Sequence, residues 1–197
     1  SIEFDEEAYD LSFGAMAEYD TPILRITYAS MTSPSRTFDY NMGSGERVLR
    51  KTQTVPSGHA ASDYVTRRIF ATGHDGVQIP VSVLHHKDTP LDGSAPVLLY
   101  GYGSYGITIP AGFSVTRLSL VDRGFIYAIA HIRGGQEMGR QWYENGKLLN
   151  KKNTFTDFID VGRFLIENKY SAPDRLFARG GSAGGLLMGA VINMAPD

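Results

Sequence analysis

The stretch that decides the fold is Leu176–Met188, which reads Leu-Phe-Ala-Arg-Gly-Gly-Ser-Ala-Gly-Gly-Leu-Leu-Met. Within it, Gly180–Gly184 fits the pattern G-x-S-x-G, with an apolar strand-like run before it and an apolar helix-like run after it. This context is typical of a nucleophile elbow, the sharp strand-to-helix turn that presents a catalytic serine. The pattern therefore predicts that Ser182 is a nucleophile at the end of a strand.

The neighbours of Ser182 fit the same interpretation. Glycines on both sides leave room in a turn where a Cβ atom would collide with the adjoining strand or helix. The following helix directs its free N–H groups toward the serine and favours negative charge there. The backbone N–H of Ala183 is therefore a candidate oxyanion donor. The competing interpretation is a glycine-rich turn between a core strand and a core helix, without any chemistry.

Composition narrows the class of protein. The chain has 197 residues, of which 42% are hydrophobic and 20% charged, as in an ordinary globular protein with one domain or one and a part. A net charge of −2 gives no electrostatic reason to expect nucleic acid or an anionic membrane as partner. There is no cysteine, and the five histidines show no metal-ligand spacing. We expect no metal and no cofactor.

Residues 1–58 have the pattern of short antiparallel strands joined by turns. The candidate strands are Ser1–Phe4, Ile23–Tyr28, Arg36–Asn41 and Glu46–Lys51. A meander of this length cannot close a core of its own, so we expect it to belong to a larger β architecture such as a propeller blade. Because the chain begins inside an apparent strand and without Met, we also expect it to be an internal piece of a longer protein.

From residue 59 the pattern changes to strands that alternate with helices. The candidate strands are Tyr64–Ala71, Gln78–Leu84, Pro96–Tyr100 and Phe125–Ala130. The first two predict a hairpin, and the wholly apolar later ones predict parallel strands covered on both faces. A hairpin followed by strand–helix alternation, with the elbow on the last strand, is the order of an α/β-hydrolase.

Two helices are predicted in the same part of the chain. One presents an apolar face made of Phe155, Phe158, Ile159, Leu165 and Ile166. Thr154 and Asp157 have the spacing of an N-terminal capping pair for it. The other helix, Leu186–Met194, is apolar on all sides, which predicts that it is buried.

A second glycine cluster, Gly101–Gly106, fits the dinucleotide-binding pattern G-x-G-x-x-G, with Asp122 near the place of a ribose-binding acid. We reject that interpretation, because Ile107–Pro110 rather than a helix follows the glycines, and Asp122 precedes a strand instead of ending one. In a hydrolase, the loop after the third strand supplies an oxyanion donor. The Tyr102 hydroxyl could be that donor, and a packed aromatic ring is the alternative.

Four motifs occur together and in a fixed order: Leu99–Gly106, Ile132–Gly135, Lys151–Phe155 and Gly180–Gly185. Together they resemble the prolyl oligopeptidase family of serine peptidases, and within it the oligopeptidase B branch, over nearly the whole chain. The resemblance implies a β-propeller that caps an α/β-hydrolase domain. Residues 1–58 would end the propeller, and residues 59–197 would form the N-terminal part of the catalytic domain, truncated after the nucleophile helix.

The resemblance also implies an activity. It is that of a cytoplasmic serine oligopeptidase that cuts short peptides after Arg or Lys through an acyl-enzyme on Ser182. It assigns the oxyanion hole to the Tyr102 hydroxyl and the Ala183 N–H, and it places Tyr105 in the pocket for the residue before the cut. Bacterial members usually carry two acids that bind a basic residue one place upstream, and Pro110 and Gly112 stand at those positions here.

We expect the catalytic partners of Ser182 to lie outside this chain. Fifteen residues follow Ser182, whereas on this fold the order Ser, Asp, His would place both partners beyond Asp197. We therefore expect the missing half of the catalytic domain to be a partner of this chain, which alone would be inactive. His131 is the nearest alternative base, but a hydrogen-bonded structural role fits it better. We expect Arg133 to be structural too, paired with a carboxylate or carbonyl near the propeller interface.

Other functions stay open. The chain as it stands could be a non-catalytic fragment, and the complete protein could be a prolyl-specific peptidase or an esterase of the same fold. An esterase explains the elbow, but it explains neither the β-meander nor the Gly101–Gly106 loop.

Overall fold

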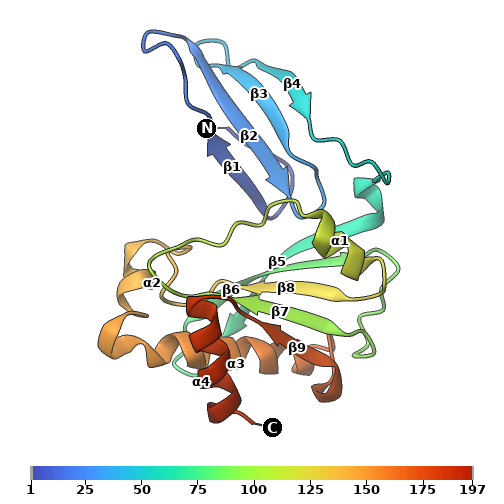
Figure 1. Cartoon of the computed structure of the whole chain (residues 1–197), viewed down its shortest axis with the longest axis vertical. Coiled ribbons are helices and arrows are strands. Elements are labelled where there is room, and N and C mark those ends of the chain that lie inside the picture. The colour runs from blue at the N-terminus through green and yellow to red at the C-terminus, as the bar shows by residue number, and fades with distance from the viewer. Residues whose placement is uncertain (1, 197) are drawn as a thin grey trace.

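The first part of the chain folds as an antiparallel sheet. The computed structural model describes residues 2–196, and Figure 1 shows this sheet standing on a larger α/β unit. Its strands pair in chain order: β1 Tyr9–Phe13, β2 Ile23–Ser30, β3 Arg36–Asn41 and β4 Arg47–Thr52. The predicted meander is confirmed. The predicted strand at residues 1–4 is wrong for residues 2–4, where the Phe4 ring stacks on Tyr28 instead, and Ser1 lies outside the described residues.

The second unit is a five-stranded mixed sheet with the order β5-β6-β8-β7-β9. Its strands are β5 Tyr64–Thr72, β6 Gln78–His86, β7 Val97–Gly101, β8 Ile126–Ala130 and β9 Leu176–Arg179. β5 and β6 form the predicted hairpin, and β6 pairs antiparallel with β8. β8, β7 and β9 are parallel, as the apolar runs of β7 and β8 predict. The fold class is α/β.

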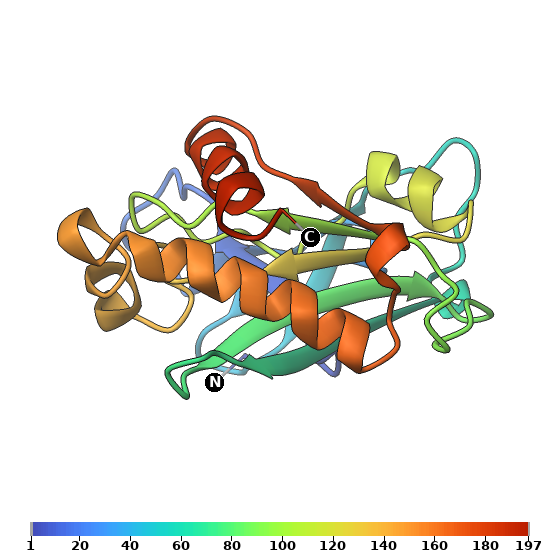
Figure 2. The same ribbon diagram turned by 90° about the horizontal axis from the view of Figure 1, so that it is seen from below.

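Helices cover both faces of this sheet (Figures 1 and 2). The helices are α1 Val115–Val121, α2 Arg140–Glu144, α3 Lys152–Glu167 and α4 Ala183–Met194, and short 3-10 turns occupy Ala61–Asp63, Leu148–Asn150 and Pro173–Arg175. α1 lies on the face toward the first sheet, and α3 and α4 lie on the opposite face. Within residues 2–196, no helix has the length and apolar character needed to cross a bilayer.

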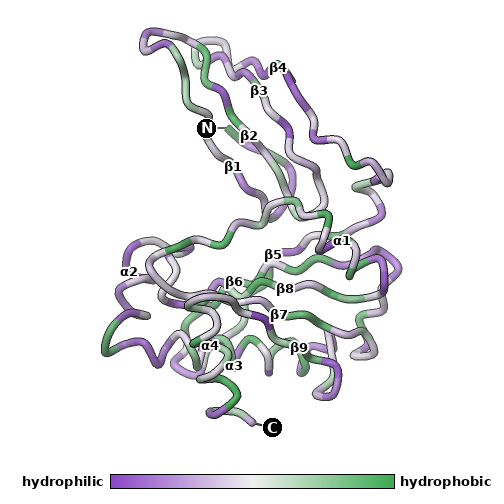
Figure 3. Tube along the Cα trace, viewed as in Figure 1, coloured by the Kyte–Doolittle hydropathy of each residue, from purple (hydrophilic) through white to green (hydrophobic). Residues whose placement is uncertain are grey.

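Each face of the second sheet has its own hydrophobic core. One core packs α3 and α4 on the sheet and includes the buried side chains of Leu99, Phe158 and Leu187. The other includes Leu118 of α1 together with Ala8 and Met31 from the first part of the chain. Figure 3 shows the hydrophobic positions that run along β7 and β8 between these cores. The two units are therefore joined by apolar packing as well as by the chain itself.

Two expectations about the helices are wrong. α3 begins at Lys152, so Thr154 lies inside its first turn, and its hydroxyl donates to the Arg133 and Gly146 carbonyls rather than capping the helix. α4 is not buried on all sides: Leu187 is 1% exposed, but Leu186 is 60% exposed. One face of α4 packs on the second unit, and nothing in residues 2–196 covers the other.

Candidate active site

Ser182 lies at the turn between β9 and α4 with a strained backbone. Its φ of 56° and ψ of −119° fall in a region that residues with a side chain rarely occupy. A Cβ on Gly180 would lie 2.3 Å from the Gly184 carbonyl oxygen, and a Cβ on Gly184 would lie 2.8 Å from that of Gly101. Gly181 has no such neighbour within 4 Å. The close packing required of a nucleophile elbow is thus present at the two glycines of the pattern.

Ala183 begins α4, so its N–H has no acceptor within the helix. The next two N–H groups close the turn, with Gly184 donating to the Gly181 carbonyl and Gly185 to the Ser182 carbonyl, each at 2.8 Å. The Ala183 N–H is therefore the donor that remains beside the Ser182 side chain. The positive end of the helix dipole favours an oxyanion at the same place.

Tyr102 follows the last residue of β7, the strand that pairs with β9. Because parallel neighbours end at the same sheet edge, the loop after β7 meets the turn after β9. The Tyr102 ring packs on the first turn of α4, since its Cδ2 is 3.7 Å from the Cβ position of Gly184. The structure thus brings the Tyr102 ring against the Ser182 turn, but Tyr102 is not among the residues that line the cavity beside Ser182.

A cavity of about 670 Å³ opens beside Ser182. Its lining residues are Ser104, Tyr105, Gly134, Tyr143, Gly146, Lys147, Leu148, Lys151, Ser182, Ala183 and Leu186. Tyr105 is 74% exposed and has a φ of 59°, which the tight loop around it imposes. The cavity brings three of the predicted site residues, Ser182, Ala183 and Tyr105, into one concave space.

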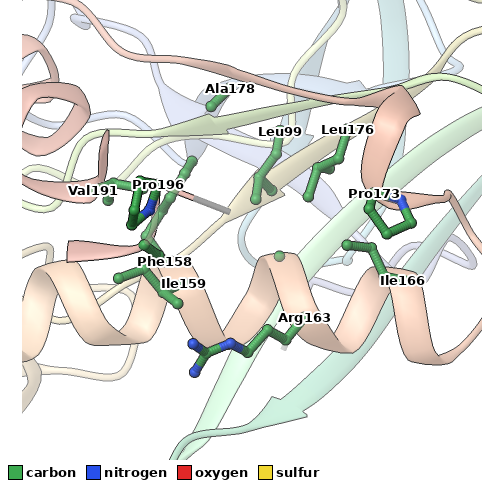
Figure 4. Close-up of a pocket in the computed structure, with 12 residues that line it drawn as sticks. Leu99, Phe158, Ile159, Arg163, Ile166, Pro173, Leu176, Ala178, Val191 and Pro196 are labelled. Carbon is green, nitrogen blue, oxygen red and sulfur yellow. The ribbon is translucent and has the colours of Figure 1, made fainter. Parts of the chain in front are cut away.

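A second, apolar pocket contains none of the predicted site residues. Figure 4 shows it between α3, α4 and the strands β7 and β9, with Leu99, Phe158, Leu176 and Val191 among its lining side chains. Its volume is about 390 Å³, and Arg163 is its one charged lining residue. It is a gap between packed elements, and its lining holds no nucleophile, histidine or carboxylate.

His131 is held in a buried network away from Ser182. Its Nε2 is 2.7 Å from the Ser82 hydroxyl and its Nδ1 is 3.4 Å from a Glu137 carboxylate oxygen. Because a carboxylate only accepts, Nδ1 donates to Glu137 and Nε2 accepts from Ser82. Burial lowers the pKa of His131 and favours the neutral ring. Ser82 is fully buried, so this arrangement cannot reach a substrate, and the structural role expected for His131 is confirmed.

In the described part of the chain, Ser182 has no histidine or carboxylate base beside it, and the basic groups in its cavity are Lys147 and Lys151. None of the residues that line its cavity is a histidine or a carboxylate. Within residues 2–196 there is also no group of three His, Cys, Asp or Glu side chains that could hold a metal ion.

Arg133 is a buried structural residue, as expected. Its guanidinium donates three hydrogen bonds to the Asp157 carboxylate of α3, with Nε shared between both oxygens, and one to Asp75 in the β5–β6 turn at 2.6 Å. Its backbone N–H also donates to Asp157 at 2.9 Å. The carboxylate partner was predicted correctly, but its location was not: both partners belong to the second unit rather than to the interface with the first sheet.

The backbone after Gly106 lacks the helix that the dinucleotide-binding pattern requires. Residues 107–114 are not helical, and α1 begins only at Val115. Asp122 ends α1 and accepts a hydrogen bond from the Tyr64 hydroxyl at 2.6 Å. Sequence reasoning missed Lys151, which lines the Ser182 cavity and whose ammonium donates to the loop that carries Tyr105.

Comparison with known proteins places this geometry in a family. Residues 111–197 match the model of the prolyl oligopeptidase family. Dipeptidyl aminopeptidase BI of Pseudoxanthomonas mexicana is 55% identical over 197 residues, which are 100% of this chain and 27% of that protein. Protease 2 of Moraxella lacunata is 42% identical over 196 residues, again 100% of this chain and 28% of that protein.

A solved structure supports the same family assignment. Oligopeptidase B from Leishmania major superposes with a TM-score of 0.94 at 45% identity, over 98% of this chain and 27% of that one. The chain thus spans about a quarter of the length of the relatives it matches. From its motifs, its strained serine turn and these relatives together, the chain belongs to the prolyl oligopeptidase family.

Proposed function

We propose that the complete protein is a serine oligopeptidase and that this chain supplies its nucleophile and its oxyanion hole. The observation that carries the proposal is the backbone of Ser182, held at a φ of 56° between β9 and α4 and facing a cavity of about 670 Å³. Such strain persists only where the surrounding packing enforces it, and it is typical of a serine that must present its hydroxyl to a substrate.

The proposed reaction uses groups of this chain in a fixed order. The Ser182 Oγ attacks the carbonyl carbon of the scissile peptide, and the carbonyl oxygen becomes an oxyanion. The Ala183 N–H and the Tyr102 hydroxyl donate hydrogen bonds to that oxygen. The catalytic base takes the Ser182 hydroxyl proton during the attack and gives it to the amine as the C–N bond breaks; water, deprotonated by the same base, then hydrolyses the acyl-enzyme and restores the Ser182 hydroxyl. We propose that the base and its orienting acid lie beyond Asp197, in the order Ser, Asp, His.

The remaining parts of the proposal rest on the family resemblance. Residues 1–58 would end a β-propeller, and residues 59–197 would begin an α/β-hydrolase domain in a cytoplasmic enzyme. Substrates would be short peptides cut after Arg or Lys, with Tyr105 beside the residue before the cut. The exposure of Tyr105 in the Ser182 cavity supports that placement.

A second candidate function is the removal of dipeptides from free N-termini. It is favoured by the relative at 55% identity, which is named a dipeptidyl aminopeptidase. The two functions differ in their need for a free amino group two residues before the cut. Matched dipeptide amides with a free and a blocked N-terminus would distinguish them: an oligopeptidase cleaves both, and a dipeptidyl aminopeptidase cleaves only the free one.

The decisive experiment for the nucleophile is Ser182→Ala in the complete protein. Turnover of a peptide amide should fall by roughly six orders of magnitude, as when a triad serine is removed. Peptide amides should be tested beside simple esters, because an esterase of the same fold would turn over only the latter. Near-normal peptidase activity in Ser182→Ala would contradict the proposal.

A further inference from the structure

Lys151 occupies a position that its own helix does not favour. It immediately precedes α3, where the helix dipole is positive and disfavours a cation. Lys151 nevertheless lines the Ser182 cavity and is half-buried, and burial lowers the pKa of its ammonium. A cation held in such a place requires specific partners.

Those partners belong to the loop after β7. The Lys151 ammonium donates to the Gly103 carbonyl oxygen at 2.6 Å and to the Ser104 hydroxyl at 2.7 Å. Both distances are short for N–H···O bonds, as expected when the donor is charged. Ser104 is 7% exposed, so the second bond lies in a region from which water is largely excluded. Lys151 therefore links the start of α3 to this loop.

The same loop is held from its other side by close packing. Gly103 has a φ of 66°, and a Cβ there would lie 2.5 Å from the Thr154 methyl group and 2.7 Å from the Ile132 side chain. A Cβ on Gly134 would lie 2.1 Å from the Gly103 carbonyl oxygen, so Gly134 packs closely against this oxygen. The Gly103 carbonyl oxygen is therefore confined between Gly134 and the Lys151 ammonium. Removal of the ammonium would leave the Gly103 carbonyl without this donor, and the peptide could then rotate.

Gly103 directly follows Tyr102, whose ring packs on the first turn of α4. A rotation of the Gly103 peptide would shift the Tyr102 hydroxyl away from the place of the oxyanion. We propose that Lys151 is a positioning residue, which holds the Tyr102–Tyr105 segment against the Ser182 turn through the Gly103 carbonyl and the Ser104 hydroxyl. This inference rests on the proposed peptidase function and on Tyr102 as an oxyanion donor.

The test uses the complete protein and a chromogenic Arg-amide peptide. Lys151→Met should lower kcat by about 100-fold with little change in KM, the scale of one lost oxyanion donor. Lys151→Arg keeps a charged donor and should recover part of the loss. Lys152→Met is the matched control, because Lys152 is exposed at the start of the same helix, and its kcat should stay within about twofold of the parent protein.

The decisive measurement is the effect of Lys151→Met on kcat in a protein that already carries Tyr102→Phe. If Lys151 acts through the Tyr102 hydroxyl, Lys151→Met should cause no further loss of kcat in Tyr102→Phe. The same fold loss in both backgrounds, or an unchanged kcat in Lys151→Met alone, would overturn the inference. Should Lys151→Met fail to fold, Ser104→Ala removes one of the two acceptors without a change of charge. Ser104→Ala must then lower kcat in the parent protein but cause no further loss in the Tyr102→Phe variant.

These outcomes are separate from failure of the proposed function. A parent protein that cleaves the substrate and a Ser182→Ala variant that does not would establish the peptidase, whatever the result at Lys151. If Ser182→Ala stays active, the peptidase assignment is wrong, and the positioning role of Lys151 is wrong with it.

Discussion

Gly180→Ala should damage the nucleophile turn far more than the equivalent change one residue later. The added Cβ would lie 2.3 Å from the Gly184 carbonyl oxygen and 2.7 Å from its carbonyl carbon. Ordinary contacts of a Cβ begin near 3.4 Å, so these backbone atoms must separate by about 1 Å. No side-chain rotation can relieve the contact, because the neighbouring atoms are main chain. The turn itself has to open, and Ser182 and the Ala183 N–H move with it.

A displacement of about 1 Å in a catalytic group costs on the order of 100-fold in rate. We therefore expect Gly180→Ala in the complete protein to lower kcat by about that factor. Gly181→Ala is the matched variant, since no atom lies within 4 Å of its Cβ position, and it should lose much less. Labelling of Ser182 by a fluorophosphonate gives the rate of nucleophile attack for both, and thermal melting shows whether each is folded. Equal labelling rates in the two variants would refute the reasoning.

Three further predictions concern substrates and the chain itself. Tyr102→Phe in the complete protein should lower kcat by about 100-fold or more, and a rise in KM alone would make Tyr102 a binding residue. Substrates with Arg-Arg and Gly-Arg before the cut should have similar kcat/KM, since the uncharged Pro110 and Gly112 offer no partner for a second cation. A hundredfold preference for Arg-Arg would show that other acids bind it. The 197 residues expressed alone should neither cleave an Arg-amide nor react with a fluorophosphonate at the rate of the complete protein, because no histidine or carboxylate lines the Ser182 cavity. Rapid stoichiometric labelling of that chain would reveal a base within it.

The features that sequence predicted well are those that local backbone chemistry dictates. The turn at Ser182 was found because only glycine tolerates the approach of Gly180 to Gly184 and of Gly184 to Gly101. The strands around it were found from their apolar runs, with bounds that differ from the structure by a few residues at most. In each case the signal lies within a short stretch of chain.

The features that sequence missed depend on partners distant along the chain. Thr154 and Asp157 have the spacing of a capping pair, but contacts with Arg133 engage both side chains in the folded protein. A local hydrogen bond and a tertiary one compete for the same oxygen atoms, and the spacing alone cannot decide between them. Lys151 was missed for the same reason, since its acceptors Gly103 and Ser104 lie 48 and 47 residues earlier.

Strand order explains why His131 cannot act as the base for Ser182, although both residues follow parallel strands. β7 separates β8 from β9 in the sheet, so the ends of β8 and β9 lie roughly 10 Å apart, twice the spacing of neighbouring strands. The His131 ring moreover points to Ser82 on β6, on the far side of β8 from β9. The base in the proposed reaction would therefore approach from the outer side of β9, which is an edge strand of the sheet within residues 2–196, or from above the turn. Residues 2–196 place no histidine or carboxylate in the cavity there, which is why the proposed reaction assigns proton transfer to groups outside them.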